Sequence, residues 1–328
     1  MARLVPLALL LVAAVLPWLG IYPLFLTKCL TFALFAMAFN MFTGYVGLLS
    51  IGHASFFGMG AYIAGYGAKA LGMPTLAALI AGMLVATLLG VVFGAIAIRR
   101  RGIYFAMITL ALAQMVYFFC NQAPFTGAED GLQNIPRGSL LGLVDLTNDI
   151  TFYYFVLAVT AFSFGAIQTI IDKPFGQTLQ AIRDNEPRAI SLGYSVNSYT
   201  LVAFTLSAAI AGLAGGLKAL TLGVATLPDV HWTQSGNVIL MCLLGGLGTR
   251  LGPIFGAVLV VVLENQLASL GIVKMGGLSI DFSTKAPIVI GIIFMLCVLL
   301  FRRGIVGEVV ALISVRRTSI ATDKTVAH

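Results

Sequence analysis

Long apolar runs make up most of this chain, and they restrict it to a membrane. Hydrophobic residues account for 59% of the 328 positions, charged residues for only 9%, and the mean hydropathy is +1.02. A soluble domain needs more charge than this, so that class is excluded. The runs approach the roughly 20 residues with which a helix crosses a bilayer, whereas barrel strands are short and alternating. The sequence therefore predicts an all-α, polytopic transmembrane helical bundle.

We predict about ten spans, within a range of eight to ten. They lie near residues 4–20, 29–44, 49–68, 75–98, 103–120, 152–171, 199–220, 235–249, 252–268 and 286–301. The first is expected to be an uncleaved span, because no cleavage site follows it in a polar flank. The whole chain, 1–328, is expected to form a single transmembrane permease domain.

Basic residues predict the orientation in the membrane. With a cytoplasmic N-terminus, 13 of the 19 Lys and Arg residues fall on the cytoplasmic side, as the positive-inside rule requires. The cytoplasmic parts then include the segment 172–198 and the tail 302–328. The loop 121–150 carries more acidic than basic residues and is expected to be periplasmic. Topology thus explains the net charge of +7, and no nucleic-acid partner is expected.

The outer loop divides the predicted spans into five and five. With an odd number of spans in each half, the second half enters the membrane from the opposite side, as in an inverted repeat. A faint echo between residues 50–58 and 248–256, which share a Phe-Gly ending, is consistent with duplication. A 5+5 inverted repeat with broken helices is one reading of this pattern, and a chain without duplication is the other.

Two glycine-rich apolar segments are the expected lining of a transport pathway. Residues 42–62 carry five glycines, with a helix break expected near Gly44 to Gly47, and residues 243–253 end a short span in glycines, an arginine and a proline. Broken helices at membrane depth are tolerated only against protein or a water-filled cavity. Paired interruptions of this kind indicate a transport route, although glycines also serve close helix packing. The pathway candidates are Gly44, Gly47, Ser50, His53, Phe57, Gln114, Gly245 and Gly246.

Small residues also recur every four positions at Ala208, Gly212 and Gly216. Such a ridge lets a neighbouring helix approach closely in a membrane. We expect this ridge to be structural.

Polar chemistry within the spans is sparse. His53 stands alone in its span, and a lone histidine is more often a hydrogen-bonded packing residue than a proton carrier. No chain of acidic residues crosses the membrane, which argues against an ion-driven pump. The sequence shows no nucleophile with its base, no metal-ligand cluster and no P-loop. We therefore expect no catalytic residue, no metal and no bound cofactor, and the chain is not expected to be an enzyme.

The segment 172–198 is polar and long for a turn between spans. Phe175, Leu179 and Ile182 repeat at helical spacing, which predicts one short amphipathic helix. Asn185 can cap a second helix that Gly193 closes. Two such helices, apolar toward the membrane domain and charged outside, would form a docking element; the alternative is an ordinary surface loop.

At this segment the sequence resembles a known family. The pattern is similar to the coupling loop of the permease subunits of bacterial ABC importers for branched-chain amino acids, a variant of the Glu-Ala-Ala motif that seats in a cleft of the ATPase. The resemblance implies a coupling role for Gly176, Ala181, Arg183, Asp184, Asn185, Glu186, Ala189 and Gly193. The chain departs from the family at Pro187 and Arg188, where small or aliphatic residues are common, and at Ala128, where Gly or Ser is commoner.

Further stretches extend the resemblance along nearly the whole chain and favour the M-type member of the permease pair. They are residues 44–62, 101–111, 126–132, 204–216 and 243–253.

The resemblance implies a multi-pass subunit of the bacterial inner membrane, with both termini cytoplasmic, that imports leucine, isoleucine and valine by alternating access. Its implied partners are a second homologous permease subunit, two cytoplasmic ABC ATPase subunits, a periplasmic solute-binding protein and the lipid bilayer. Urea, short amides and aromatic acids are alternative solutes within the family. A stand-alone channel or secondary transporter is the competing class.

Overall fold

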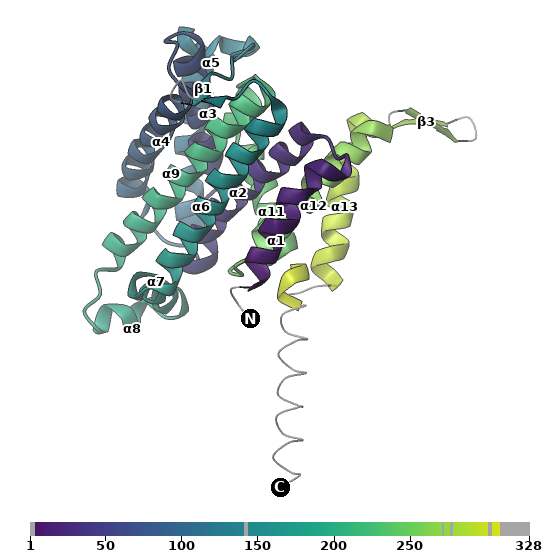
Figure 1. Ribbon diagram of the computed structural model, residues 1–328. Coiled ribbons are helices and arrows are strands. Elements are labelled where there is room, and N and C mark those ends of the chain that lie inside the picture. Colours follow the sequence, from purple (N-terminus) through teal and green to yellow (C-terminus); the bar gives the residue numbers. More distant parts are fainter. Residues whose placement is uncertain (1–3, 141–143, 271, 276–277, 301–303, 309–328) are drawn as a thin grey trace.

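The protein is a helical bundle (Figure 1). The computed structural model describes residues 4–140, 144–270, 272–275, 278–300 and 304–308. Within these ranges, ten helices have at least 12 residues: α1 (Leu4–Val15), α2 (Pro23–Val46), α3 (His53–Lys69), α4 (Thr75–Ala97), α5 (Ile103–Gln122), α6 (Asp149–Asp172), α9 (Val196–Leu222), α11 (Trp232–Gly245), α12 (Gly252–Leu270) and α13 (Phe282–Leu300). The shorter helices are α7 (Pro174–Asp184), α8 (Glu186–Ser191) and α10 (Leu227–Val230).

Two small antiparallel hairpins and three single turns complete the described elements. The hairpins pair β1 (Ser139–Leu140) with β2 (Val144–Asp145), and β3 (Ile272–Met275) with β4 (Leu278–Asp281). The 3₁₀ turns are η1 (Leu16–Leu19), η2 (Pro124–Thr126) and η3 (Ala128–Asp130).

Each predicted span coincides with one of the ten longer helices, so the polytopic helical bundle is confirmed. Five of these helices, α2, α4, α5, α6 and α9, are long and apolar enough to cross a membrane by themselves. Shorter apolar stretches lie at Ala8–Leu19, Gly252–Leu267 and Ile288–Cys297. The number of crossings therefore stays a prediction.

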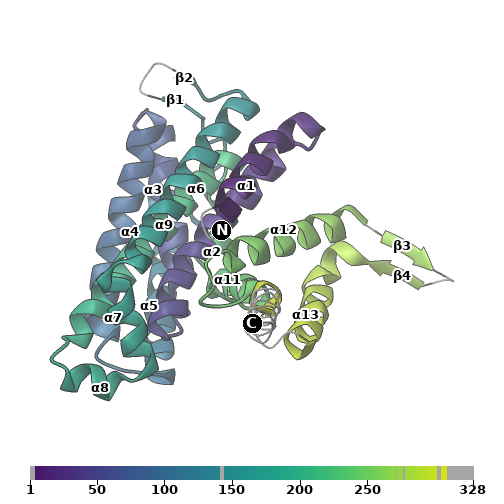
Figure 2. The ribbon, with the colours of Figure 1, turned by 60° about the horizontal axis from the view of Figure 1, so that its bottom comes forward.

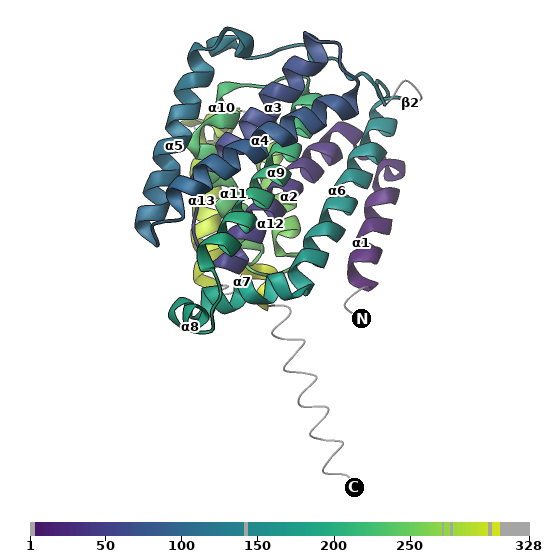
Figure 3. The same ribbon diagram turned by 90° about the vertical axis from the view of Figure 1, so that its left-hand side faces the viewer.

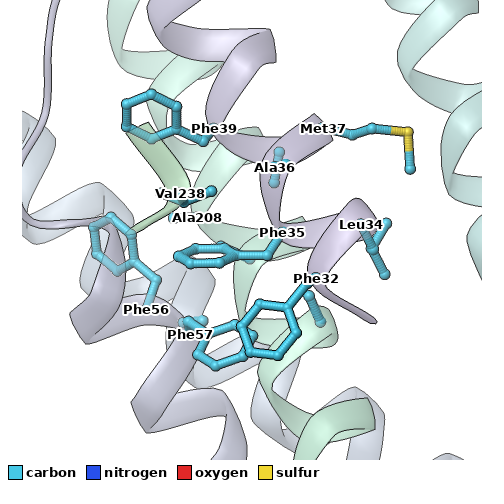
Figure 4. Packing of buried hydrophobic residues seen from close by; sticks show 14 of the residues in the cluster. Phe32, Leu34, Phe35, Ala36, Met37, Phe39, Phe56, Phe57, Ala208 and Val238 are labelled. Atoms are coloured by element: carbon cyan, nitrogen blue, oxygen red, sulfur yellow. The ribbon is translucent and has the colours of Figure 1, made fainter. Parts of the chain in front are cut away.

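The centre of the bundle is built on α2, α3 and α9. Every residue of α2 from Thr31 to Val46 is buried, as expected of a helix that is apolar on all sides. Aromatic rings fill the spaces between these helices: Phe35 stacks on Phe57 at 4.4 Å between ring centroids (Figure 4), and Phe42 meets Phe204 edge-on at 4.8 Å. Around this centre, α12 and α13 lie on the opposite side of α2 from α4 (Figure 2).

The small-residue ridge of α9 packs as predicted, because α9 contacts both α3 and α4 (Figure 3). Gly212 faces Ala86 of α4 so closely that an added Cβ would overlap its methyl group, and a Cβ on Gly216 would lie 2.9 Å from the Leu79 side chain. Across the interface, a Cβ on Gly60 of α3 would overlap the Gly212 carbonyl. The helices therefore touch main chain to main chain, which is how helices associate within a membrane.

The outer segment 123–148 folds over the C-terminal end of α9. Leu132 and Ala225 exchange two main-chain hydrogen bonds of 2.8 and 2.9 Å, and Ile135 N donates to Gly223 O at 2.9 Å. Arg137 donates to the carbonyls of Leu220 and Thr221, and it pairs with Asp149 at the start of α6. These bonds satisfy helix-end carbonyls that have no partner within α9.

Ala128 in this segment adopts a φ of +52°, in the left-handed region. Glycine enters that region without steric cost, whereas a Cβ is disfavoured there. This explains why a glycine suits the position at which the chain departs from the family pattern.

The two ends of the bundle carry different segments. The start of α1 lies at the same end as α7 and α8, whereas β1 and the outer segment lie at the other end (Figure 1). This agrees with the predicted alternation along the chain. The direction in which the bundle sits in the membrane stays a prediction.

The sequence echo does not support the inverted repeat. Residues 50–58 and 248–256 cover the α2–α3 and α11–α12 connections, and both connections lie beside Arg183 of α7. Equivalent segments of an inverted repeat would lie at opposite ends of the bundle. The 5+5 duplication therefore has no support from this pair and stays untested.

The ridge gives a first prediction. Gly60→Ala adds one methyl group against the main chain of Gly212, and such overpacking is expected to cost about 1–3 kcal/mol. The detergent-solubilised protein should then unfold at a lower temperature. Gly165→Ala in α6 is the matched control, because a Cβ there meets no atom within 4 Å and the substitution favours the helix. Equal melting temperatures for the two variants would contradict the close packing.

Candidate functional site

The polar segment 172–198 forms two short helices, as predicted. α7 begins at Pro174, the first helical position, where proline is favoured because its missing N–H would have no partner. The chain leaves the helical conformation at Asn185, whose side-chain oxygen accepts a hydrogen bond from Arg188 N at 3.1 Å and caps α8. Gly193, at φ +88°, ends α8 in the left-handed conformation.

One face of this pair is packed on the bundle. Gly176, Leu179 and Ile182 of α7 are buried, and a Cβ on Gly176 would overlap the carbonyl of Ile171. Ile182, Ala189 of α8 and Val196 of α9 form a small hydrophobic cluster. The amphipathic helix predicted from sequence is therefore confirmed for α7.

The opposite face exposes large apolar side chains. Ile190 is 57% exposed, Leu192 70% and Tyr194 42%. They lie beside exposed charged and polar groups, including Asp184 and Arg188. Sequence reasoning missed these residues because it expected only charges on the outer face. The sequence offered one signal for Ile190. It directly follows Ala189, which packs inward, and neighbouring residues of a helix point to different sides.

A cation of α7 reaches into the end of α2. Arg183 Nη1 donates to the carbonyl of Gly44 at 2.8 Å, while the side-chain methylenes of Arg183 lie over Gly47, where a Cβ would come within 2.6 Å of Cγ. The same guanidinium contacts Asp184 at 3.1 Å. Arg183, a predicted coupling residue, thus contacts two of the predicted pathway residues, Gly44 and Gly47.

Two ion pairs attach the segment 172–198 to the α4–α5 turn and to the α11–α12 turn. Arg101, in the α4–α5 turn, pairs with Glu186 at 2.9 Å and donates to Asn197 at 3.1 Å. Arg250, in the α11–α12 turn, pairs with Asp172 at the end of α6. Sequence reasoning used these arginines only for topology, since no local pattern reveals a partner so far along the chain.

Asn40 joins the end of α2 to the α11–α12 turn. Its amide nitrogen donates to Thr249 O at 3.0 Å, and its amide oxygen accepts from Gly248 N at 2.7 Å. A Cβ on Gly44, one turn later, would come within 2.7 Å of the same Gly248 N. A cleft of about 390 Å³ opens beside this contact, between residues 46–48 and 182–187, with Arg101 on its wall.

The pathway candidates are mostly enclosed within the chain. Gly44, Ser50, His53, Phe57, Gly245 and Gly246 are buried, Gln114 is half-buried and Gly47 is exposed. His53 Nε2 lies 2.9 Å from Ser207 Oγ, which donates to the carbonyl of Ala38. This arrangement fits the packing role that a lone histidine usually has. The part of these residues in a solute pathway stays a prediction.

Metal ligands are not gathered anywhere in the part of the chain that the structure describes. No group of three or more His, Cys, Asp or Glu side chains there could hold a metal ion. At α7 and α8, one face is bonded to the end of α2 and to the α4–α5 turn, and the other face is exposed.

Comparison with known proteins identifies relatives over most of the chain. Residues 22–302 match the family described as branched-chain amino acid transport system / permease component. The high-affinity branched-chain amino acid transport system permease protein LivM of Salmonella typhimurium is 29% identical over 280 residues, and that of Escherichia coli 28%. In both cases the alignment covers 77% of this chain and 66% of the relative, slightly under two thirds of its length.

A further relative is covered almost completely. The permease protein BraD of Pseudomonas aeruginosa is 24% identical over 304 residues, which are 86% of this chain and 94% of that protein. No solved structure matches the chain. Because the family match extends over most of the helices, from α2 to α13, the chain belongs to the family of branched-chain amino acid transport permease components.

Proposed function

We propose that the chain is the transmembrane permease subunit of an ABC importer for branched-chain amino acids. The observation that carries the proposal is the two-faced α7–α8 element. Its inner face is fastened to the bundle through Arg183 and Glu186, and its outer face exposes Ile190, Leu192 and Tyr194. Exposed apolar side chains outside the hydrocarbon region mark a surface for a protein partner. The occupant proposed is a cytoplasmic ABC ATPase, the partner that the coupling-loop resemblance implies.

The complete importer would contain three further subunits and a soluble binding protein. We propose a second homologous permease subunit, two cytoplasmic ATPase subunits that hydrolyse ATP, and a periplasmic solute-binding protein that docks at the end formed by the outer segment. The chain then lies in the bacterial inner membrane with both termini cytoplasmic. It binds no cofactor and no nucleic acid in this scheme.

Closure of the ATPases would drive alternating access through α7 and α8. A ligand or partner shifts a conformational equilibrium only if it contacts the two states differently. The α7–α8 element could make such different contacts, because it touches α2, the α4–α5 turn and α9 at once. ATP-dependent movement of this element would therefore act on several spans.

Leucine, isoleucine and valine are the proposed solutes, since the relatives are named for branched-chain amino acids. Urea, short amides and aromatic acids are the alternatives, because a separate binding protein selects the solute. Calorimetric titration of the partner binding protein with each class decides between them. A stand-alone transporter, the other functional class, requires solute flux from this chain reconstituted alone.

A polar face of α5 is the proposed wall of the solute route. Gln114, Tyr117 and Asn121 recur at three- and four-residue spacing, so they lie on one side of the helix and are half-buried. The Tyr117 ring meets that of His231, before α11, edge-on at 5.1 Å. The Oδ1 atom of Asn121 is buried without a hydrogen-bond partner in the described part of the chain. Polar side chains within a span, such as Gln114, face a cavity or another subunit, which here would be the second permease.

The ion pair at the rim of the coupling element gives a second prediction. Glu186→Lys places a cation beside Arg101 and should loosen α8 from the α4–α5 turn. ATP-driven uptake into proteoliposomes should fall about fivefold, the factor that 1 kcal/mol represents, while the amount of permease in the membrane is unchanged. Exchanging the charges in the double variant Arg101→Glu with Glu186→Arg should restore uptake. Normal uptake by Glu186→Lys would refute the role of this pair.

Gly193 gives a third prediction. Its φ of +88° is unfavourable for a β-branched residue, and no atom lies within 4 Å of an added Cβ, so Gly193→Val would strain the main chain without a steric clash. The end of α8 should shift, and less ATPase should co-purify with the permease. Gly193→Asn is the control, because asparagine tolerates the left-handed region. Equal recovery of ATPase with both variants would count against the docking surface.

Gln114 gives a fourth prediction. Gln114→Leu removes the polar group proposed to face the solute route, and the maximal uptake rate with saturating binding protein should fall while ATP hydrolysis continues. Met115→Leu is the matched control on the next position of α5, where the side chain is 68% exposed and apolar. A similar uptake rate for the two variants would remove this face from the route.

A further inference from the structure

Three elements far apart in sequence meet around one guanidinium group. Arg183 of α7 donates to Gly44 O at the end of α2, and its Nη1 atom lies 3.6 Å from the Cβ position of Gly248 in the α11–α12 turn. Asn40 binds the same turn through both atoms of its amide. The coupling helix and the two helix connections therefore share a single contact region, which we call the α2 node: Asn40, Gly44, Arg183, Gly248 and Thr249.

We infer that Arg183 and Asn40 are positioning residues that carry the movement of α7 through the end of α2 to the α11–α12 turn. The inference rests on the proposed function, because it names the route by which the coupling element would act on the spans. Arg183 links α7 to α2, and Asn40 links α2 to the turn. Neither residue touches solute or ATP in this scheme.

The chemistry at Gly44 explains why the first link is firm. The last four carbonyls of a helix have no partner inside it. The Gly44 carbonyl is one of these four, because Gly44 lies two residues before Val46, the last residue of α2. The C-terminal end of a helix also carries partial negative charge, which favours a cation there. Arg183 supplies both the donor and the charge. It binds the main chain of α2 directly, so Arg183 is the only side chain in the link between α7 and α2.

The second link lies on the same side of α2. Residues 40 and 44 are four apart, so Asn40 and Gly44 occupy one face in successive turns. The Asn40 amide donates to one main-chain group and accepts from another, a pair of bonds that neither an aspartate nor a leucine can form. Since a Cβ on Gly44 would come within 2.7 Å of Gly248 N, the two main chains are in direct contact.

The other attachments of the segment differ in kind. Arg250 with Asp172 and Arg101 with Glu186 join pairs of side chains that are partly exposed to solvent. Such pairs contribute little on average, because water competes for the charges and the side chains are flexible. Those pairs join side chain to side chain, whereas in the α2 node side chains bind main chain: Arg183, itself 38% exposed, binds Gly44 O, and Asn40 binds the α11–α12 turn.

The test uses the whole importer, this chain with its permease, ATPase and binding-protein partners, in proteoliposomes, and measures uptake of radiolabelled leucine together with ATP hydrolysis. Arg183→Gln and Asn40→Asp should leave assembly and ATP hydrolysis in place, while uptake per ATP hydrolysed falls at least about fivefold, which corresponds to 1 kcal/mol. Arg183→Lys keeps the positive charge and a hydrogen-bond donor, so its uptake per ATP hydrolysed should fall less than that of Arg183→Gln. Because the two residues act in series, the double variant should lose little more than the more damaged single variant.

Arg100→Gln is the matched control, since Arg100 is an exposed arginine in the nearby α4–α5 turn and forms no ion pair in the described part of the chain. If Arg183→Gln and Arg100→Gln give the same uptake per ATP, the inference is overturned. If Arg183→Gln does not assemble, Asn40→Asp decides, and a ratio of uptake to ATP hydrolysis equal to that of the unmodified chain overturns the inference. Absence of ATP-dependent uptake with the unmodified chain would instead refute the proposed function.

Discussion

The close approach of main chains between helices is the constraint on which this fold depends. Lipid is as apolar as leucine, so helices gain little from hiding hydrocarbon from it and must gain from contact at short range. The chain meets this need by omitting side chains where helices cross, as at Gly60 and Gly212. The same device serves the coupling region, where Gly44 and Gly248 lie in contact and leave room for Arg183. The bundle and the contact between α2, α7 and the α11–α12 turn thus use the same structural solution.

Much of the fold was predictable because its causes are local. Apolar run length predicted the ten longer helices, four-residue spacing predicted the α9 ridge, and Asn185 with Gly193 predicted two short helices in the polar segment. The contacts that organise the site were not predictable, because Arg183 and Gly44 are 139 positions apart. Glycine also gives an ambiguous signal: it permits both close packing and an open pathway, and most of the candidate pathway residues proved to be buried.

The two faces of α7 and α8 differ in the kind of contact that they can make. The inner face uses directed bonds, from Arg183 and Glu186, whose geometry fixes its position on the bundle. The outer face uses Ile190 and Leu192, whose contacts are non-directional and depend mainly on area. An element held rigidly on one side and adaptable on the other can pass on movement while tolerating variation in its partner. Pro187 and Arg188, where the chain departs from the family pattern, lie on this adaptable side.

The outer segment has a consequence for how such permeases diversify. Its main chain is bonded to Gly223 and Ala225 after α9, and the Arg137 side chain binds the carbonyls of Leu220 and Thr221, so a chimaera whose new segment lacked a basic residue at position 137 would lose the side-chain bonds to the end of α9. The outer segment and the end of α9 thus form one structural unit, although they are distant in sequence. The helices α7 and α8 are attached differently, through the close approach of Gly176 to Ile171 and through side-chain bonds from Arg183 and Glu186. A new outer surface built by exchange among related chains would therefore have to include the end of α9 as well.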